Sequence, residues 1–396
     1  MYFQVLDEKY DCVGVYLDEK IYYDKIPDGL SRTWRYVKFL EDDSYSVEYA
    51  NLYCGKKTLM QVCPEDLKNR LDGIMKRLKA FFVSFKHAKV SLYDNCFYDL
   101  VPERFLLEYC YLKNEITKHV LENYDKPKNY DFLADLSKVV EDIRHERLNI
   151  DVATLDSKLG SEKTRNFVKK LSRIDHHIDY DVFGTITGRL TTKPKSFPIL
   201  TLNKEHRCVI KPKNDLFIEL DYNSAEIRTL LALQGLSQPK SDIHAWICKN
   251  VFNGQITREE TKQKVFAWLY NPEAKNEKLE KLFNKKEVLA KYWDGEYLET
   301  FFDRKILADE RHALNYLIQS TTSDLFLRGA IKIWKLIKDR KSNVSFTIHD
   351  SLVLDYSEED RDLLNQIVDT FSKNDLGTFK VNVSMGRDFG NMKKIN

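Results

Sequence analysis

The stretch DLFIELDYNSAEIRTLLAL, residues 215–233, begins as an apolar run and continues in a helical pattern. The run from Leu216 to Leu220 is typical of a buried strand. A helix is expected to follow the turn at Asp221, with Glu226 and Arg228 in its first turns. A carboxylate at the end of an apolar strand is costly without a partner, because burial removes its water. The stretch therefore predicts that Asp221 has a partner in the fold.

A second polar tip occurs in FTIHDSLVLDY, residues 346–356. If its two apolar runs pair as neighbouring strands, His349 and Asp350 lie at the tight turn between them. A meeting of this turn with Asp221 on one sheet would create a site for divalent ions. Magnesium fits such a site, because it takes few protein carboxylates and completes its shell with water and substrate phosphates. The alternative for each aspartate alone is that it only ends or caps its strand.

The segment ITREETKQKVFAWLY has Thr257 and Glu260 in capping-box spacing, so a helix should start at Arg258. Arg258, Lys262 and Phe266 then share one face, because each step of four residues drifts by only about 40°. Two cations followed by an aromatic ring suit triphosphate oxygens and then a sugar or base. The alternative is an ordinary amphipathic helix with a salt-bridged side.

The segment DERHALNYLIQSTTSDLF repeats this spacing with Arg311, Asn315 and Gln319, beside the apolar Leu314 and Leu317. An arginine and two long amides suit hydrogen bonds to the backbone and to minor-groove acceptors, which every base pair offers. A solvent-facing polar stripe is the alternative.

These motifs resemble those of the polymerase domain of family A DNA polymerases, the class of bacterial polymerase I and several phage replicases. The resembling segments are TGRLTTKPKSFPILTL, DYNSAEIR, RxxxKxxxFxxxY, RxxxNxxxQ and HDS, in the order of the family, over about residues 183–392. The resemblance implies an α+β fold of the right-hand polymerase type, with an antiparallel palm sheet, helical fingers and a helical thumb. The implied divisions are 1–100, a small N-terminal α/β domain that resembles a degenerate exonuclease; 101–180, a thumb-like region; 181–250, the first part of the palm; 251–305, the fingers; and 306–396, the second part of the palm.

The resemblance also implies template-directed DNA synthesis with two magnesium ions, held by Asp221 and Asp350. One ion would lower the pKa of the primer 3′-hydroxyl and the other, about 3.5 to 4 Å away, would stabilise the α-phosphate and the leaving pyrophosphate. Lys262 completes the implied catalytic set, and Glu226 would exclude a 2′-hydroxyl. The implied nucleotide-binding residues are Arg258, Lys262, Phe266, Tyr270, Glu226 and Tyr222. The implied contacts to primer-template DNA are Arg189, Arg228, Arg311, Asn315, Gln319 and His349.

Two positions depart from the family pattern, which usually has glutamate where this chain has Ser351 and glycine where it has Asn271. Ser351 raises an alternative, because single-subunit RNA polymerases commonly have histidine-aspartate-serine there. Glu226, Phe266 and the lack of length for a promoter-binding domain favour DNA synthesis. A non-catalytic nucleic-acid-binding protein on a polymerase scaffold is a third reading, which loss of either aspartate would favour; both are present.

The first hundred residues predict strands followed by helices, with one hairpin around Asp18-Glu19 and another within residues 34–50. No D-x-E pair occurs on an early strand, and Asp94 and Asp99 are too few to hold two metals. We therefore expect no 3′ to 5′ exonuclease in this chain. A separate exonuclease, a clamp or a helicase is a possible partner.

The composition of this chain of 396 residues, which is 43% hydrophobic, limits its expected location and partners. There is no apolar run of about 18 residues and no secretory leader, so we expect no membrane partner and a cytoplasmic location in a bacterial or infected host cell. The seven cysteines lack metal-ligand spacing. Residues 158–213 contain 13 Lys and Arg against 5 Asp and Glu. This basic excess predicts a grip on duplex backbone at the end of the thumb-like region.

Overall fold

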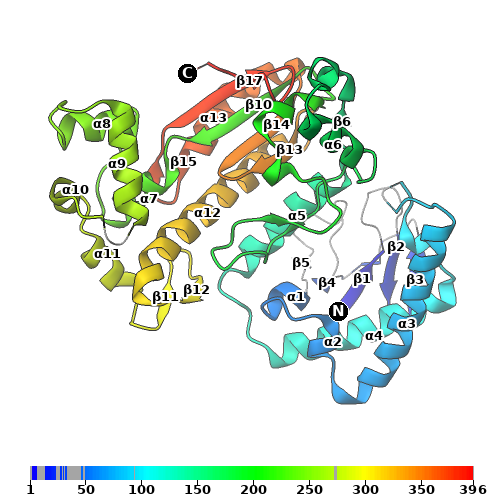
Figure 1. Ribbon diagram of the computed structural model, residues 1–396. Helices are drawn as coiled ribbons and strands as arrows, with labels where there is room; N and C mark the ends of the chain where they lie inside the picture. The colour runs from blue at the N-terminus through cyan, green and yellow to red at the C-terminus, as the bar shows by residue number, and fades with distance from the viewer. Residues whose placement is uncertain are drawn as a thin grey trace. The chain divides into compact units, whose positions relative to one another are not determined.

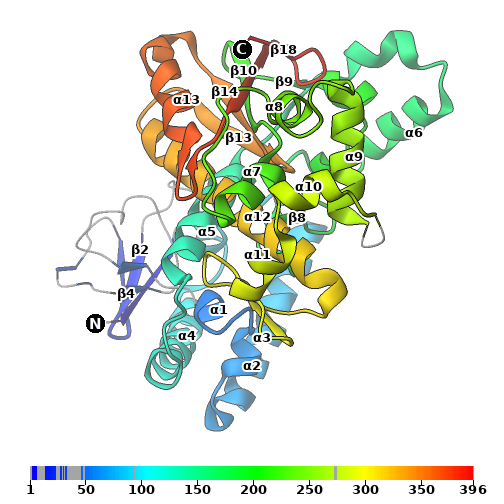
Figure 2. The same cartoon turned by 90° about the vertical axis from the view of Figure 1, so that its left-hand side faces the viewer.

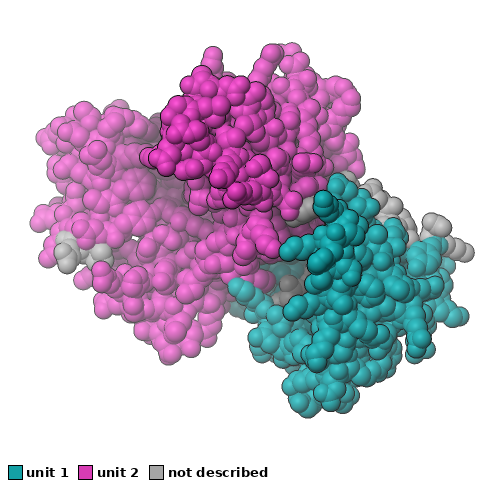
Figure 3. Space-filling view, turned by 45° about the vertical axis from the view of Figure 1, so that its right-hand side comes forward, with its two compact units in different colours: residues 1–138 teal, residues 139–396 magenta. Residues whose placement is uncertain are grey.

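The computed structural model describes residues 2–6, 14–23, 27–28, 30, 32–33, 46–47, 50–92, 94–271 and 274–395 (Figure 1). The chain divides into two compact units, residues 1–138 and 139–396, which Figure 3 colours separately. All the predicted site residues belong to the second unit. Among the helices of the described residues, none is both long enough and apolar enough to cross a membrane.

The first unit contains a five-stranded mixed sheet of order β3-β2-β1-β4-β5 and the helices that follow it. The predicted hairpin around Asp18-Glu19 is confirmed, because β2 and β3 pair antiparallel on either side of it. The hairpin predicted within residues 34–50 falls largely outside the described residues. The elements are β1 Tyr2–Val5, β2 Gly14–Leu17, β3 Lys20–Tyr23, β4 Arg32–Thr33, β5 Ser46–Val47, α1 Ala50–Tyr53, α2 Leu59–Val62, α3 Glu65–His87 and α4 Glu103–Asn123, with α5 Tyr130–His145 crossing the unit boundary.

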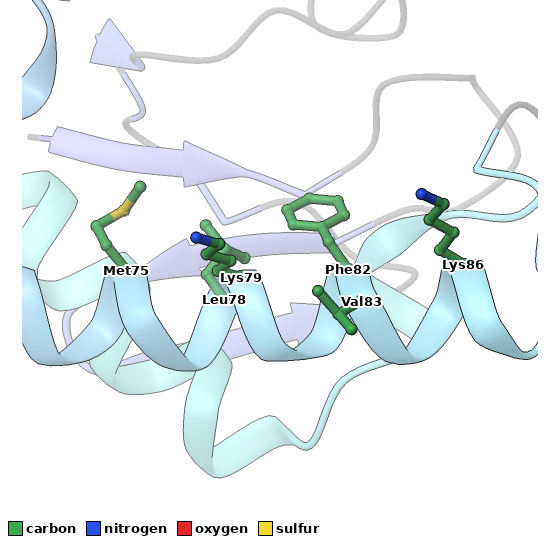
Figure 4. Close-up of a pocket in the computed structure, with 6 residues that line it drawn as sticks. All are labelled: Met75, Leu78, Lys79, Phe82, Val83 and Lys86. Carbon is green, nitrogen blue, oxygen red and sulfur yellow. The ribbon is translucent and has the colours of Figure 1, made fainter.

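Helix α3 begins after Pro64 and buries Leu71, Ile74 and Leu78 on one stripe, as its periodicity predicts. Part of the rest of its surface is apolar and open. Figure 4 shows a shallow pocket there, where apolar side chains stand beside two lysines. The pocket is lined by Met75, Leu78, Lys79, Phe82, Val83 and Lys86.

The second unit is built on a five-stranded antiparallel sheet of order β13-β14-β10-β17-β18 (Figure 1). Its strands are β10 Leu216–Tyr222, β13 Asn343–Ile348, β14 Ser351–Tyr356, β17 Val381–Gly386 and β18 Lys393–Lys394. The architecture is therefore a mixture of helices and an antiparallel sheet, as predicted. Strand β10 is two residues longer than predicted, and its helix α7 starts at Ala225 rather than directly after Asp221.

The long helix α12, Glu310–Ile337, and α13, Leu364–Ser372, contact one another and the sheet (Figure 1). α12 is buried along most of its second half, including Leu325, Phe326 and Ile333. Removal of such side chains from water contributes about 1.5 to 3 kcal/mol each. The apolar side chains of α12 therefore pack against the sheet, and the ends of its central strands remain available for polar groups.

The remaining helices of this unit are α6 Glu162–Leu171, α7 Ala225–Leu233, α8 Ile243–Asn250, α9 Arg258–Tyr270, α10 Glu277–Leu282 and α11 Lys285–Tyr292. The short strands pair as β6 Asn149–Ile150 with β9 Ile210–Lys211, β7 Tyr180–Asp181 with β8 Thr191–Thr192, β11 Tyr297–Glu299 with β12 Lys305–Leu307, and β15 Lys373–Asn374 with β16 Gly377–Thr378. Helices α8, α9, α10 and α11 form a lobe next to α7 (Figures 1 and 2). Its core contains the buried Trp268, Phe283 and Leu279.

Candidate active site

The two predicted acidic tips lie next to each other in the sheet. Strand β10 pairs with β14 so that Asp221 is opposite Ser351, the residue after Asp350. The β13–β14 pairing confirms the predicted tight turn at His349 and Asp350. His349 has a φ of +51°, a left-handed conformation that is strained for a residue with a side chain. Both aspartates line one cavity.

The cavity has a volume of about 650 Å³ and is built from segments far apart in the sequence. It lies where the ends of the central strands meet α7, α8, α9 and α12. Its lining residues are Arg189, Asp221, Tyr222, Asn223, Ser224, Ala225, Glu226, Ile227, His244, Arg258, Lys262, Phe266, Tyr270, Gln319, His349, Asp350 and Asn382.

Burial raises the pKa of both the Asp221 and the Asp350 carboxyl groups. It raises the pKa of Asp221 to about 6, with further increases from Glu219 and Asp350 and a partial offset from hydrogen bonds. It also raises the pKa of Asp350, which Arg189 and His349 partly counteract. Two neighbouring carboxylates whose pKa values burial raises would be stabilised in their charged form by a nearby cation.

The Asp221 carboxylate is oriented by two neutral donors from the flanking strands. Asn382 Nδ2 on β17 donates to Oδ2 at 3.0 Å, and Ser351 Oγ on β14 donates to Oδ1 at 3.4 Å. Lys394 Nζ in turn donates to Asn382 Oδ1 at 3.0 Å. Ser351, the departure from the family pattern, therefore contacts Asp221 without adding a third charge.

Helix α9 presents the predicted cationic and aromatic face to the cavity. The capping box is confirmed, since Thr257 Oγ1 accepts from Glu260 N, Glu260 accepts from Thr257 N, and the helix begins at Arg258. Lys262 Nζ lies 5.9 Å from the centre of the Phe266 ring. The rings of Phe266 and Tyr270 stack at 5.9 Å with 12° between their planes.

Arg258 is held by Asp242, which caps α8. Its Nε and Nη2 atoms donate to the two Asp242 oxygens at 3.1 and 2.8 Å. Burial alone would raise the pKa of Asp242, but hydrogen bonds from Arg258, Asn223 and the Ala245 N–H hold it well below its usual range. The arginine fork is thus oriented before any ligand binds.

His244 is a cavity residue that the sequence analysis did not identify. Its ring lies 5.9 Å from that of Phe266, and Nε2 is 2.9 Å from Ser224 Oγ. Burial lowers its pKa to about 4, and Arg258 and Lys262 contribute in the same direction. The imidazole is therefore neutral at pH 7 and adds hydrogen-bonding capacity without charge.

Arg189 lies between the acidic groups of the cavity. Its Nη2 donates to Glu226 Oε1 at 2.6 Å and is 3.9 Å from Asp350 Oδ2. Burial raises the pKa of Glu226, and the charge of Arg189 and the repulsion of Asp350 act in opposite directions on it. The predicted sugar-selecting carboxylate and the predicted primer-end arginine therefore form one ion pair.

Helix α12 brings only the last of its three predicted residues to the cavity. Gln319 lines it, whereas Asn315 and Arg311 lie one and two turns towards the start of the helix, respectively, and are not among its lining residues. Arg311 is exposed, and Asn315 is half-buried with an Oδ1 atom that has no hydrogen-bond partner among the described residues. These side chains extend a polar stripe away from the cavity.

The structure corrects the predicted contact of Arg228 with DNA. The side chain is fully buried, and burial lowers its pKa to about 10. Its guanidinium donates to the main-chain oxygens of Asn223, Pro239 and Ser241 at 2.8 Å each. No donor is left at the surface for a phosphate, so its role is to hold the loop that leads to Asp242.

Tyr222 is a second correction, because its ring and hydroxyl are engaged with α13 and not with the cavity that it borders. Successive residues of a strand point to opposite faces, so Tyr222 and Asp221 diverge. The ring of Tyr222 stacks on Phe371 of α13 at 4.4 Å, and its hydroxyl donates to Phe371 O at 2.6 Å. It is 2% exposed and borders the cavity without offering its ring or hydroxyl.

The donor set fits magnesium in number and chemistry. Within the described residues, no three His, Cys, Asp or Glu side chains gather into a group that could hold a metal ion. The paired Asp221 and Asp350 are hard oxygen donors that burial leaves short of counter-charge. A pair of carboxylates open to a large cavity suits a cation that keeps water and substrate oxygens in its shell.

Asn223, Ser224, His244 and Asn382 are the polar cavity residues that sequence reasoning missed. The first two belong to the quoted strand–helix stretch and could have been identified by their position at its turn. His244 follows an aspartate that caps a short helix, a pattern common in many proteins. Asn382 has no local signal, because only the pairing of β17 with β10 places it beside Asp221.

No model of a known protein family and no curated protein sequence matches the chain. Among solved structures, the chain is similar to the POL domain of Pol1 from M. smegmatis in complex with DNA primer-template and dNTP, with a TM-score of 0.45 and 16% identity. The match covers 72% of this chain and 55% of that one, so this chain spans about half its length. A likeness of this degree does not identify the activity.

Proposed function

We propose that this protein is a template-directed DNA polymerase, which adds deoxynucleotides to a primer 3′ end by nucleotidyl transfer. The observation that carries the proposal is the cavity, in which Asp221 and Asp350 face the cationic and aromatic side of α9. This arrangement suits a magnesium–triphosphate complex. The acidic groups at one wall would bind the metal ion, and the cations at the other wall would bind the phosphates. The order of the five family A motifs in the sequence supports the same function.

In this proposal the residues of α9 bind the incoming nucleotide. Arg258 and Lys262 neutralise the triphosphate, and Phe266 lies against the sugar with Tyr270 near the templating base. Glu226 fills the space that a 2′-oxygen would occupy, while Arg189 reaches the primer end. Binding of a triphosphate at Arg258 competes with Asp242 for the same guanidinium.

Magnesium is the cofactor that the site would hold, with Asp221 and Asp350 as its protein ligands. When bound, magnesium supplies charge stabilisation at the reacting phosphate and acidifies the primer hydroxyl. Ser351 and Asn382 contribute by fixing the orientation of the Asp221 carboxylate. His349 would support the primer end from the strained turn.

The proposal assigns the parts of a right-hand polymerase to this chain. The five-stranded antiparallel sheet with α12 and α13 would be the palm, within residues 181–250 and 306–396. Residues 251–305 would be the fingers and 101–180 the thumb-like region. Gln319, Asn315 and Arg311 would follow the minor groove of the primer-template. Residues 1–100 carry no proofreading activity in this proposal, so excision of a mismatched primer end would contradict it.

The test is extension of a labelled primer on a longer template with magnesium and deoxynucleotides. The wild type should extend the primer, and Asp350→Asn should reduce the rate by at least about a hundredfold, because it removes one of two metal-binding charges. Asp369→Asn is the matched control, since that carboxylate is exposed on α13 outside the cavity. Primer-template binding without extension would favour a non-catalytic scaffold.

A second candidate function, RNA synthesis, is favoured by Ser351 alone. The same assay with ribonucleotides distinguishes it, because the two activities differ only in the sugar that the cavity accepts. Preference for deoxynucleotides supports the proposal, whereas preference for ribonucleotides would replace it with a single-subunit RNA polymerase.

A further inference from the structure

A buried ion pair outside the cavity joins the β11–β12 hairpin to α12. Arg304 Nε and Nη2 donate to the Asp324 oxygens at 3.1 and 2.7 Å, a two-point contact. Asp324 is 2% exposed, and the Arg304 side chain is 15% exposed. Such a pair costs desolvation free energy and is not by itself a stabilising device. Its position therefore calls for a reason other than stability.

The planar face of this guanidinium covers one glycine. A Cβ atom added to Gly188 would lie 2.5 Å from Arg304 Nη2 and 2.7 Å from its Cζ. Gly188 has a φ of +77°, which other residues rarely adopt. Both the conformation and the close approach of Arg304 therefore require glycine at this position.

The covered glycine belongs to the turn that carries Arg189. Gly188 N donates to Thr185 O at 3.4 Å, and Thr185 Oγ1 donates to Arg189 O at 2.9 Å. From the end of this turn, Arg189 Nη2 reaches Glu226 Oε1 and approaches Asp350. A shift of the turn would move the only arginine that the cavity places between these two carboxylates in the described part of the chain.

We infer that Arg304 and Asp324 are positioning residues, which clamp the Gly188 turn so that Arg189 stays between Glu226 and Asp350. The two hydrogen bonds that Asp324 accepts fix the orientation of the Arg304 guanidinium, and the guanidinium packs against the Gly188 turn. The pair touches neither substrate nor metal and acts only through Arg189. This inference rests on the proposed function for its kinetic consequence, but its structural part does not.

The double variant Arg304→Met/Asp324→Leu removes the pair without leaving a buried charge unpaired. Its matched control is Arg340→Met/Asp362→Leu, which removes an exposed arginine–aspartate pair of the same unit. Hydrogen exchange of the segment 183–190 should become at least about tenfold faster in the first variant, because the turn opens locally. The control should leave that exchange unchanged. Unchanged exchange in both variants would overturn the inference.

Primer extension then separates positioning from general stability. With the pair removed, kcat should fall by about ten- to a hundredfold, because small displacements of a reacting-site group are costly, while KM for the primer-template changes little. Arg189→Ala should then cause little further loss in that background, since both changes remove the same interaction. Losses that simply multiply would refute an action through Arg189.

Gly188→Ala gives an independent arm with the ion pair intact. The added methyl group collides with Arg304 and is strained at the positive φ of this residue, so exchange of residues 183–190 should rise and kcat should fall as in the double variant. Alanine that leaves both unchanged would overturn the inference. If the wild type extends no primer, the proposed polymerase function fails, and the exchange data alone still decide whether the pair clamps the turn.

Discussion

Replacing Asp221 by asparagine removes a buried charge while keeping the shape of the side chain. Burial raises the pKa of this carboxyl from an ordinary 3.8 to about 6. Between these values the folded protein binds the proton more tightly than the unfolded chain does, so folding stability falls as the pH rises from about 4 to about 6. Above that range the full cost of burying the ionised carboxylate remains, and this difference in pKa corresponds to about 3 kcal/mol of folding stability.

The Asp221→Asn variant should therefore be more stable than the wild type at pH 8. An amide still accepts a hydrogen bond from Asn382, but loss of the charge-assisted contact offsets about 1 kcal/mol of the gain. A net gain of about 2 kcal/mol should raise the melting temperature of the unit 139–396 by about 4 to 8 °C. At pH 4 the gain should disappear, because the folded wild type then carries a protonated Asp221 and avoids most of the cost of burying the charge, while the unfolded chain is only partly ionised at its ordinary pKa of 3.8.

Thermal melting of both proteins in chelator, from pH 4 to pH 8, measures this difference. Asp369→Asn, an exposed substitution on α13, should show no pH-dependent gain. Magnesium should narrow the gap, since binding at ten times its Kd stabilises the wild type by about 1.4 kcal/mol. An Asp221→Asn protein that is less stable than the wild type at pH 8, or a difference that does not vary with pH, would refute the reasoning.

Three further variants test separate parts of the second unit. Glu226→Ala should raise ribonucleotide incorporation in primer extension, because it opens the space assigned to the 2′-oxygen and frees Arg189. Lys262→Ala should lower kcat by about a hundredfold with nearly unchanged duplex affinity, since the proposal places this cavity lysine against the nucleotide alone. Lys169→Gln with Lys170→Gln should weaken duplex binding and reduce the slope of log affinity against log salt by about 1.8, because the predicted grip of this basic segment on the duplex would lose two phosphate contacts at the end of α6.

Each of these has a matched control. Glu226→Gln keeps the volume of the side chain and should retain sugar selectivity; unchanged selectivity in Glu226→Ala would contradict the assigned role. Lys264→Ala removes a lysine from another side of α9, and equal losses in catalysis and duplex binding for Lys262→Ala would count against nucleotide binding. Lys281→Gln, on α10, should leave the salt dependence of duplex binding unaltered.

Local patterns predicted the elements of the site well. The Thr257 capping box placed the start of α9 at Arg258, because the signal consists of neighbouring side chains and backbone. The apolar runs on either side of His349 and Asp350 predicted the β13–β14 turn for the same reason. Such features depend on residues a few positions apart and need no knowledge of the rest of the chain.

Errors arose where the direction of a side chain depended on distant partners. Tyr222 follows Asp221 directly, but pleating turns its ring to the α13 side, where Phe371 covers it. Arg228 lies on the side of α7 that faces the loop before Asp242, so its guanidinium donates hydrogen bonds to main-chain oxygens. Composition and spacing are the same for an arginine that meets DNA and for one that is buried.

By itself, the sequence determined the strand, turn and helix types and supplied two acidic tips, a cationic helix face and the TGRL segment. Periodicity and capping are short-range properties, so these followed from adjacent residues. Only the tertiary structure decided which of these groups meet, because strand register and helix packing set distances between residues more than a hundred positions apart. That is why Asn382 beside Asp221, and Arg304 over Gly188, became visible only in the folded chain.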